Sequence, residues 1–187
     1  MAYFKRSRTK KVYRSKRLNA LKVGDFNPSD FKKFLSNLDS SIWNKDKYRL
    51  QWRGQEDTQS ILVKYNTENP LDLFKKQEDQ FPKVKEQLLP FFKKMEELVP
   101  DREVFRTIIT KLPKQRSIGL HVDPKEYQQL IRFHWTIQTN EKCEMIFRKE
   151  KFHFKEGEIW YFNNLVLHAV KNVGNTDRIH VIVDFKK

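Results

Sequence analysis

The chain has 187 residues, a formal net charge of +14 at pH 7, and 33% charged residues. This length predicts one domain with a sizeable buried core. The single cysteine, Cys143, excludes an internal disulfide, and no segment approaches the roughly 20 apolar residues of a membrane-spanning helix. The amino terminus (MAYFKRSRTKK) also lacks the apolar run of a signal sequence. We therefore expect a cytoplasmic protein with no membrane partner.

Positive charge is concentrated at the amino terminus. Residues 1–24 contain nine Lys and Arg residues and no acid, which leaves only 14 − 9 = +5 for the remainder. We treat 1–24 as a basic arm and 25–187 as a single domain. The arm could bind phosphates of a nucleic acid, or it could be a solvated segment. Its apolar residues, which include Val12, Tyr13 and Leu18, would also let part of it pack as an edge strand.

Residues 25–100 are predicted to be a helical support. A helix is expected from Ser29, because Phe31, Phe34, Leu35 and Leu38 then recur at helical spacing. One strand is expected at Ser60–Tyr65. A second helical zone, Lys75–Val99, carries an apolar stripe and should be kinked or divided at Pro90.

Residues 101–187 change from a helical to an alternating pattern, which is typical of β-strands. Short strands are predicted at Val104–Lys111, Ser117–His121, Leu130–Gln138, Glu144–Phe147, Lys151–Phe154, Glu158–Phe162, Leu167–Asn172 and Arg178–Phe185. Many short strands separated by turns indicate a sandwich or a jelly roll. The expected fold is therefore mainly β with a helical layer packed against the roll.

Two segments of this β region, SIGLHVD and GEIWYFNNLVLHAVKNVGNTDRIHVIVDF, carry residues suited to metal chemistry. The first contains His121 and Asp123, and the second contains His168 and, ten residues later, Arg178. Two histidines and one carboxylate form the ligand set of non-haem Fe(II) oxygenases. A guanidinium can hold a carboxylate of 2-oxoglutarate through two parallel hydrogen bonds.

The strand LIRFHWTIQ places Arg132 and His134 on one face and its apolar residues on the other. The final strand places Arg178 on the corresponding polar face. If both polar faces line the roll, Arg132, His134 and Arg178 surround a space suited to a dianion. An unpaired buried guanidinium would be costly, so each arginine is expected to meet a ligand or a partner acid.

These segments, together with RFHWTIQTN, resemble the aspartyl/asparaginyl β-hydroxylase-like branch of the Fe(II)/2-oxoglutarate-dependent dioxygenases. The resemblance extends over Val104–Phe185 and depends on the order of the motifs: a histidine, an Arg-x-His strand, a second histidine, and an Arg-x-His-x-x-x-Asp strand. It implies a double-stranded β-helix (jelly roll, cupin-like) fold, Fe(II), 2-oxoglutarate as co-substrate, and O2.

The resemblance implies that His121 and His168 bind the metal. The β-hydroxylases of secreted protein domains have glycine where this chain has Asp123, so Asp123 is expected to complete a full triad, as in the free amino-acid hydroxylases of the family. A carboxylate at this position also argues against a halogenase, because it leaves no room for halide.

For the co-substrate, the resemblance implies that Arg178 holds the distal carboxylate of 2-oxoglutarate. Arg132 and His134 are expected to help at the co-substrate, and Thr110 is a candidate hydroxyl donor from the strand before the first histidine.

The function implied is hydroxylation of an amino-acid side chain, free or in a protein, with release of succinate and CO2. One alternative is a non-catalytic jelly-roll module whose basic arm binds nucleic acid. Another is a nucleic-acid oxygenase, although the second arginine typical of base demethylases is absent after Arg178. The residues do not predict an oligomeric state.

Overall fold

The computed structural model describes residues 18–43, 50, 54–66, 68–69 and 71–187. Its longer helices are α2 (Ser29–Ser36) and α3 (Pro82–Leu98), and its short 3-10 turns include η1 (Ser40–Ile42) and η3 (Lys125–Gln129). Residues 1–17 lie outside this described part, so the role predicted for the basic arm stays a prediction. Neither helix is long and apolar enough to span a membrane, within the part of the chain that the structure describes.

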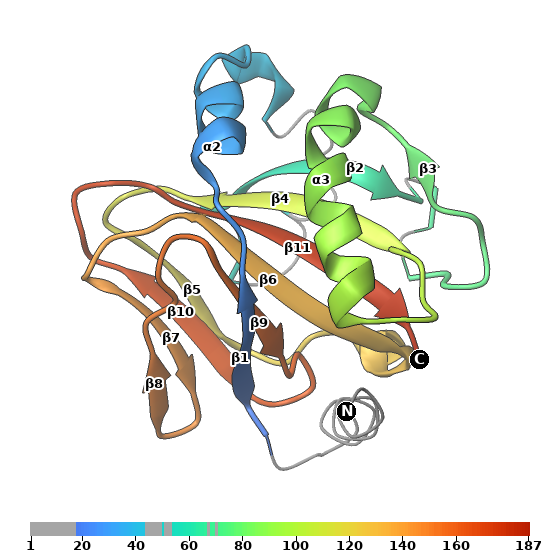
Figure 1. The fold of residues 1–187 in the computed structure, drawn as a ribbon. Coiled ribbons are helices and arrows are strands. Elements are labelled where there is room, and N and C mark those ends of the chain that lie inside the picture. Colours follow the sequence, from blue (N-terminus) through green and yellow to red (C-terminus); the bar gives the residue numbers. More distant parts are fainter. Residues whose placement is uncertain (1–17, 44–49, 51–53, 67, 70) are drawn as a thin grey trace, which may run out of the picture.

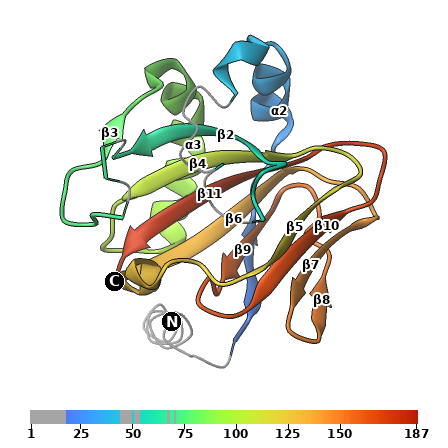
Figure 2. The ribbon, with the colours of Figure 1, turned by 180° about the vertical axis from the view of Figure 1, so that it is seen from behind.

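The strands form two antiparallel sheets (Figure 1, Figure 2). The larger sheet contains β1 (Ala20–Asp25), β2 (Gln59–Tyr65), β3 (Glu78–Asp79), β4 (Arg106–Leu112), β6 (Leu130–Gln138), β9 (Glu158–Phe162) and β11 (Arg178–Lys186). Its strand order is β1-β9-β6-β11-β4-β2-β3. The smaller sheet has the order β5-β10-β7-β8, with β5 (Arg116–His121), β7 (Cys143–Phe147), β8 (Glu150–Phe152) and β10 (His168–Asn172).

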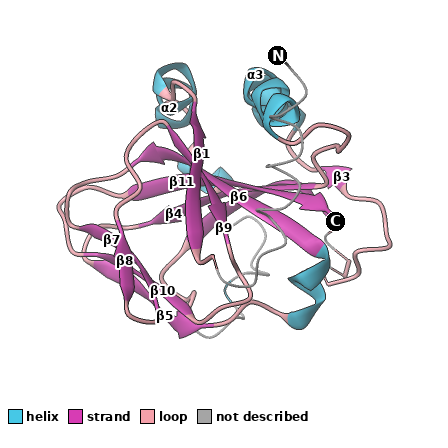
Figure 3. Cartoon of the chain, turned by 60° about the horizontal axis from the view of Figure 1, so that its bottom comes forward, coloured by secondary structure: helices cyan, strands magenta, loops and turns pink. Residues whose placement is uncertain are grey.

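The helices cover the outer face of the larger sheet, and the smaller sheet lies against its inner face (Figure 3). The outer face buries Phe133, Trp135, Val181 and Val183, as the alternation in the sequence predicted. The Trp135 ring stacks on Phe91 of α3 with ring centroids 4.3 Å apart. Burial of each such side chain contributes roughly 1.5–3 kcal/mol, so this core fixes the helices on the sheet. The prediction of a mainly β jelly roll with a helical layer is confirmed.

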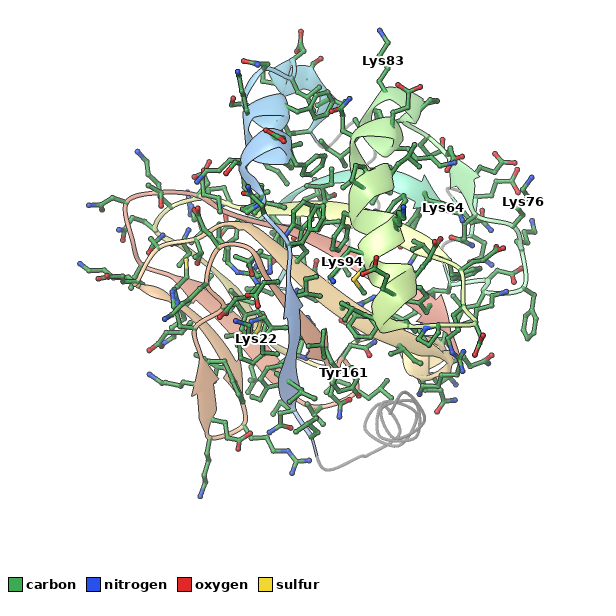
Figure 4. All side chains as sticks on the ribbon, in the orientation of Figure 1. Lys22, Lys64, Lys76, Lys83, Lys94 and Tyr161 are labelled. Carbon is green, nitrogen blue, oxygen red and sulfur yellow. The ribbon has the colours of Figure 1, made fainter. Side chains whose placement is uncertain are left out.

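Helix α3 starts later than predicted and is not divided at Pro90. It begins at Pro82 rather than near Lys75, because proline suits the first helical turn and disfavours helix in the residue before it. It also continues unbroken through Pro90. Pro90 and Glu86, whose carbonyl loses its helical donor, both lie on the exposed side of the helix, where water can replace that donor. Lys83 extends outward from the same helix (Figure 4).

Strand β1 forms one edge of the larger sheet by pairing with β9. This agrees with the suggestion that part of the arm packs as an edge strand. The division of the chain between residues 24 and 25 stays a prediction, and β1 spans it.

Candidate metal centre

The two predicted histidine ligands lie directly opposite each other in the smaller sheet. His121 is the last residue of β5, His168 is the first of β10, and the two are register partners. Residues opposite each other in an antiparallel pair bring their side chains into contact. Asp123 follows in the loop after β5, where its backbone N–H donates to the Asn164 carbonyl at 3.2 Å. The sheet and this loop therefore bring together three residues that are up to 47 positions apart.

The ligand atoms of His121, Asp123 and His168 all lie within 4.8 Å of one another. The two imidazole centroids are 4.2 Å apart, and His121 Nε2 is 3.6 Å from Asp123 Oδ1. This spacing allows one ion to contact all three side chains.

Both imidazoles are oriented by backbone carbonyls. The Nδ1 of His121 is 2.8 Å from the Gly119 oxygen, and the Nδ1 of His168 is 2.8 Å from the Val166 oxygen. A carbonyl oxygen only accepts hydrogen bonds, so each Nδ1 carries the proton and donates it. Each Nε2 therefore keeps its lone pair for a metal, which is the usual arrangement around histidine ligands.

The charge state of His168 also suits a metal ligand. Burial lowers the pKa of His168 to about 4, with nearby His121 adding to this effect and the Asp123 carboxylate opposing it. His168 is thus neutral at neutral pH and need not lose a proton before binding. Two imidazoles and one carboxylate fit a divalent transition metal and leave further coordination positions for exogenous ligands.

Arg178 is buried and faces no acid among the described residues. It is 5% exposed, and its Nη2 is 3.0 Å from the neutral ring nitrogen Nδ1 of His180. Burial lowers the pKa of Arg178 to about 10, with the nearby Cys143 thiol opposing this effect. Asp177 and Asp184, the acids that could have paired with it, make other contacts: Asp177 accepts from Lys114 N, and Asp184 binds two other arginines. A buried cation of this kind suits an anionic ligand.

A row of polar side chains crosses the inner face of the larger sheet beside Arg178. His180 of β11 is the register partner of Thr110 on β4 and of Thr136 on β6. All three are buried. His180 Nε2 and Thr136 Oγ1 have no hydrogen-bond partner within the described part of the chain. Thr110 therefore lies across the strand pairing from His180, which is two residues along β11 from Arg178, and donors for a carboxylate gather there. Its contact with a co-substrate stays a prediction.

Thr136 and His180 were not assigned to the site from the sequence. Thr136 lies two residues after His134 on the polar face of β6, and this alternation was the signal that could have identified it.

Arg132 and His134 lie on the same inner face but nearer the metal ligands. Arg132 forms ion pairs with Asp184 and with Asp123. His134 stacks on Phe162 with ring centroids 4.4 Å apart and lies 5.7 Å from the His180 ring. Their predicted contact with a co-substrate stays a prediction. Asp184 and Arg178 are six residues apart on one strand, about 20 Å at 3.3 Å per residue, so Arg132 and Arg178 mark opposite ends of the inner face.

Comparison with known proteins identifies the family of this chain. The family model for aspartyl/asparaginyl beta-hydroxylase matches residues 20–187. An L-proline cis-4-hydroxylase from Rhizobium meliloti (strain 1021) is 28% identical over 100 residues, which is 52% of this chain. The matched segment spans only 36% of that relative's length.

Solved structures with the same fold include a 2OG-Fe(II) oxygenase family oxidoreductase from Burkholderia pseudomallei. It has a TM-score of 0.54 and 10% identity, and the match covers 89% of this chain and 93% of that one. The viral collagen prolyl hydroxylase of Paramecium Bursaria Chlorella virus-1 has a TM-score of 0.52 and 14% identity, with 91% and 97% covered. These likenesses show the fold, while the family model covers most of the sequence. The chain therefore belongs to the aspartyl/asparaginyl beta-hydroxylase family.

Proposed function

We propose that the protein is an Fe(II)- and 2-oxoglutarate-dependent dioxygenase that hydroxylates an amino-acid side chain, free or within a protein. The observation that carries this proposal is the placement of a His-Asp-His cluster and a buried arginine on facing surfaces of one jelly roll, with no acid among the described residues paired to that arginine. A purely structural cluster would not need both features. Family membership and the similarity to a proline hydroxylase support the choice of an amino-acid substrate.

His121, Asp123 and His168 would hold the iron, since each presents a ligand atom to a common point. Arg178 would bind the distal carboxylate of 2-oxoglutarate, with Thr110 as a hydroxyl donor beside it. When bound, iron and 2-oxoglutarate supply the oxidising chemistry: O2 is consumed, 2-oxoglutarate becomes succinate and CO2, and a substrate C–H becomes C–OH.

The chain itself contributes charge, orientation and exclusion of water. The Gly119 and Val166 carbonyls fix the orientation of the imidazoles, and burial keeps His168 neutral. Phe147 and Phe162 contact the His168 ring, with centroids 6.0 and 4.9 Å away, and form an apolar wall behind the metal site. Such a wall limits the access of water to reactive species.

Succinate release from 2-oxoglutarate tests the proposal. Wild-type protein supplied anaerobically with Fe(II) and then exposed to O2 should release succinate slowly without a prime substrate, and faster with the correct amino acid or peptide. His168→Ala should release none. His153→Ala is the matched control, because the His153 ring contacts the Cys143 carbonyl and lies outside the metal cluster. Equal succinate from wild type and His168→Ala would refute the catalytic assignment.

A further inference from the structure

Arg132 joins the metal cluster to the sheet behind it. Its Nε donates to Asp184 Oδ1 at 2.8 Å and its Nη2 donates to Asp184 Oδ2 at 3.0 Å. Its Nη1 donates to Oδ2 of Asp123. One guanidinium therefore holds two carboxylates at once, one on strand β11 and one in the loop that supplies a metal ligand. All three of its nitrogens are engaged.

The anchor beneath Arg132 is rigid. Asp184 is 1% exposed and also accepts from Arg106 Nε at 2.9 Å and from Arg106 Nη2 at 2.6 Å. The ring of Tyr127 lies 4.1 Å from the Arg106 guanidinium carbon and 5.3 Å from that of Arg132. Two arginines and two aspartates balance in charge, which is what permits their burial. Arg132 thus starts from a fixed position.

The two oxygens of Asp123 have different neighbours. Oδ2 accepts from Arg132, whereas Oδ1 is the oxygen 3.6 Å from His121 Nε2. A free carboxylate can turn and offer one or both oxygens to a metal. Here the side chain is held at one oxygen, and the other faces the histidines.

We infer that Arg132 is a positioning residue for Asp123: it holds Oδ2 so that Oδ1 alone is directed to the metal. The inference rests on the proposed function only in that His121, Asp123 and His168 bind a metal. It gives Arg132 a role different from the co-substrate contact expected from the sequence. Arg178, which pairs with no acid in the described part of the chain, lies at the far end of the inner face.

Two matched substitutions separate positioning from charge and from stability. Arg132→Lys keeps the positive charge near the ion, but its ammonium lacks the planar array of donors with which the guanidinium binds two carboxylates at once. Arg106→Lys makes the same change on the other side of Asp184, where the Arg106 guanidinium binds Asp184 through Nε and Nη2. Calorimetric titration with Mn(II) measures metal affinity without turnover, and thermal unfolding measures stability.

Arg132→Lys should weaken Mn(II) binding 10- to 100-fold, the usual cost of losing the partner that orients a ligand. Arg106→Lys should bind Mn(II) with wild-type affinity, even if its Tm falls by as much as that of Arg132→Lys. In the Asp123→Ala background, Arg132→Lys should have no further effect on Mn(II) affinity, because the group it positions is gone.

Three results would overturn the inference. One is a wild-type Mn(II) affinity in Arg132→Lys. If the 2-oxoglutarate affinity of that variant fell instead, the result would favour the co-substrate role of Arg132. Another is an equal loss of metal affinity in Arg106→Lys. The third is a loss that persists without Asp123. All three leave the proposed function standing, whereas a wild-type protein that binds no Mn(II) would refute both.

A crystal structure of the wild-type complex with Mn(II) and 2-oxoglutarate provides a second measurement if Arg132→Lys fails to fold. Arg132 Nη1 should remain on Asp123 Oδ2 in that complex. A guanidinium that leaves Asp123 to bind the co-substrate would overturn the inference.

Discussion

Replacement of Arg178 by methionine should stabilise the protein in the absence of ligands. The fall in the pKa of Arg178 from its ordinary value to about 10 corresponds to about 3 kcal/mol of disfavoured charge, at 1.36 kcal/mol per pKa unit. Methionine has a similar length and no charge, so Arg178→Met removes this cost. It also removes the hydrogen bond to His180, worth about 1 kcal/mol. The expected net gain is about 2 kcal/mol.

Thermal unfolding measures this gain as a rise in Tm of roughly 4–8 °C for a chain of this length. The same variant should lose the further rise that 2-oxoglutarate and Mn(II) together give to wild type, because stabilisation by a ligand requires that it bind. Stability and function would then change in opposite directions at one residue.

Arg132→Met is the matched control, since it is the same substitution at another buried arginine of the same sheet face. It leaves Asp123 and Asp184 each short of a partner, and should destabilise the protein by about 3–5 kcal/mol. If Arg178→Met proved as destabilising as Arg132→Met, Arg178 would be part of a structural ion pair and the reasoning would fail.

Three further predictions concern stability and binding. Leu88→Ala should destabilise the domain by about 2–5 kcal/mol in urea unfolding, because Leu88 is fully buried under α3, whereas Leu89→Ala at the exposed neighbouring position should change it by less than about 0.5 kcal/mol. Burial, aided by the nearby charge of Arg178, holds the pKa of His180 well below 6.5. Below pH 6.5 the unfolded chain therefore binds a proton that the folded chain excludes, and the free energy of unfolding decreases as the pH is lowered. His180→Gln should therefore reduce this slope by up to about 1.36 kcal/mol per pH unit, and an unchanged slope between pH 5 and 7 would contradict the assignment. If the arm binds nucleic acid, a variant that lacks residues 1–17 but keeps β1 should lose salt-sensitive binding to DNA. An unchanged affinity for DNA would exclude nucleic acid as a partner of the arm.

The regular strands were predictable because alternation alone defines them. The predicted bounds of β6 and β9 match the structure. Both strands lie inside the larger sheet, where one face packs on the helices and the other faces the smaller sheet. The division of β6 and β11 into an apolar and a polar face followed from the same period of two. Fold class and the inward direction of Arg132, His134 and Arg178 were therefore accessible from the sequence.

Other features depend on contacts that form only in the folded chain, and no local sequence pattern predicts these contacts. The short strand β3 exists because β2 pairs with it, in a segment predicted to begin a helix. The carbonyls that orient His121 and His168 belong to residues two positions earlier. Only the irregular pairing at the end of β5 and the loop before β10 bring them within 2.8 Å of the two Nδ1 atoms.

The different roles of the two buried arginines Arg132 and Arg178 could not be predicted from the sequence. Arg132 and Arg178 each begin an Arg-x-His motif on a polar strand face, and the sequence analysis predicted a co-substrate contact for both. The structure separates them through Asp184, which lies opposite Arg132 across the β6–β11 pairing and about 20 Å along the strand from Arg178. A carboxylate within reach makes one arginine part of the scaffold that holds Asp123. No carboxylate within the described part of the chain pairs with Arg178, and the proposed function assigns to that cation an anion from outside the chain, the distal carboxylate of 2-oxoglutarate.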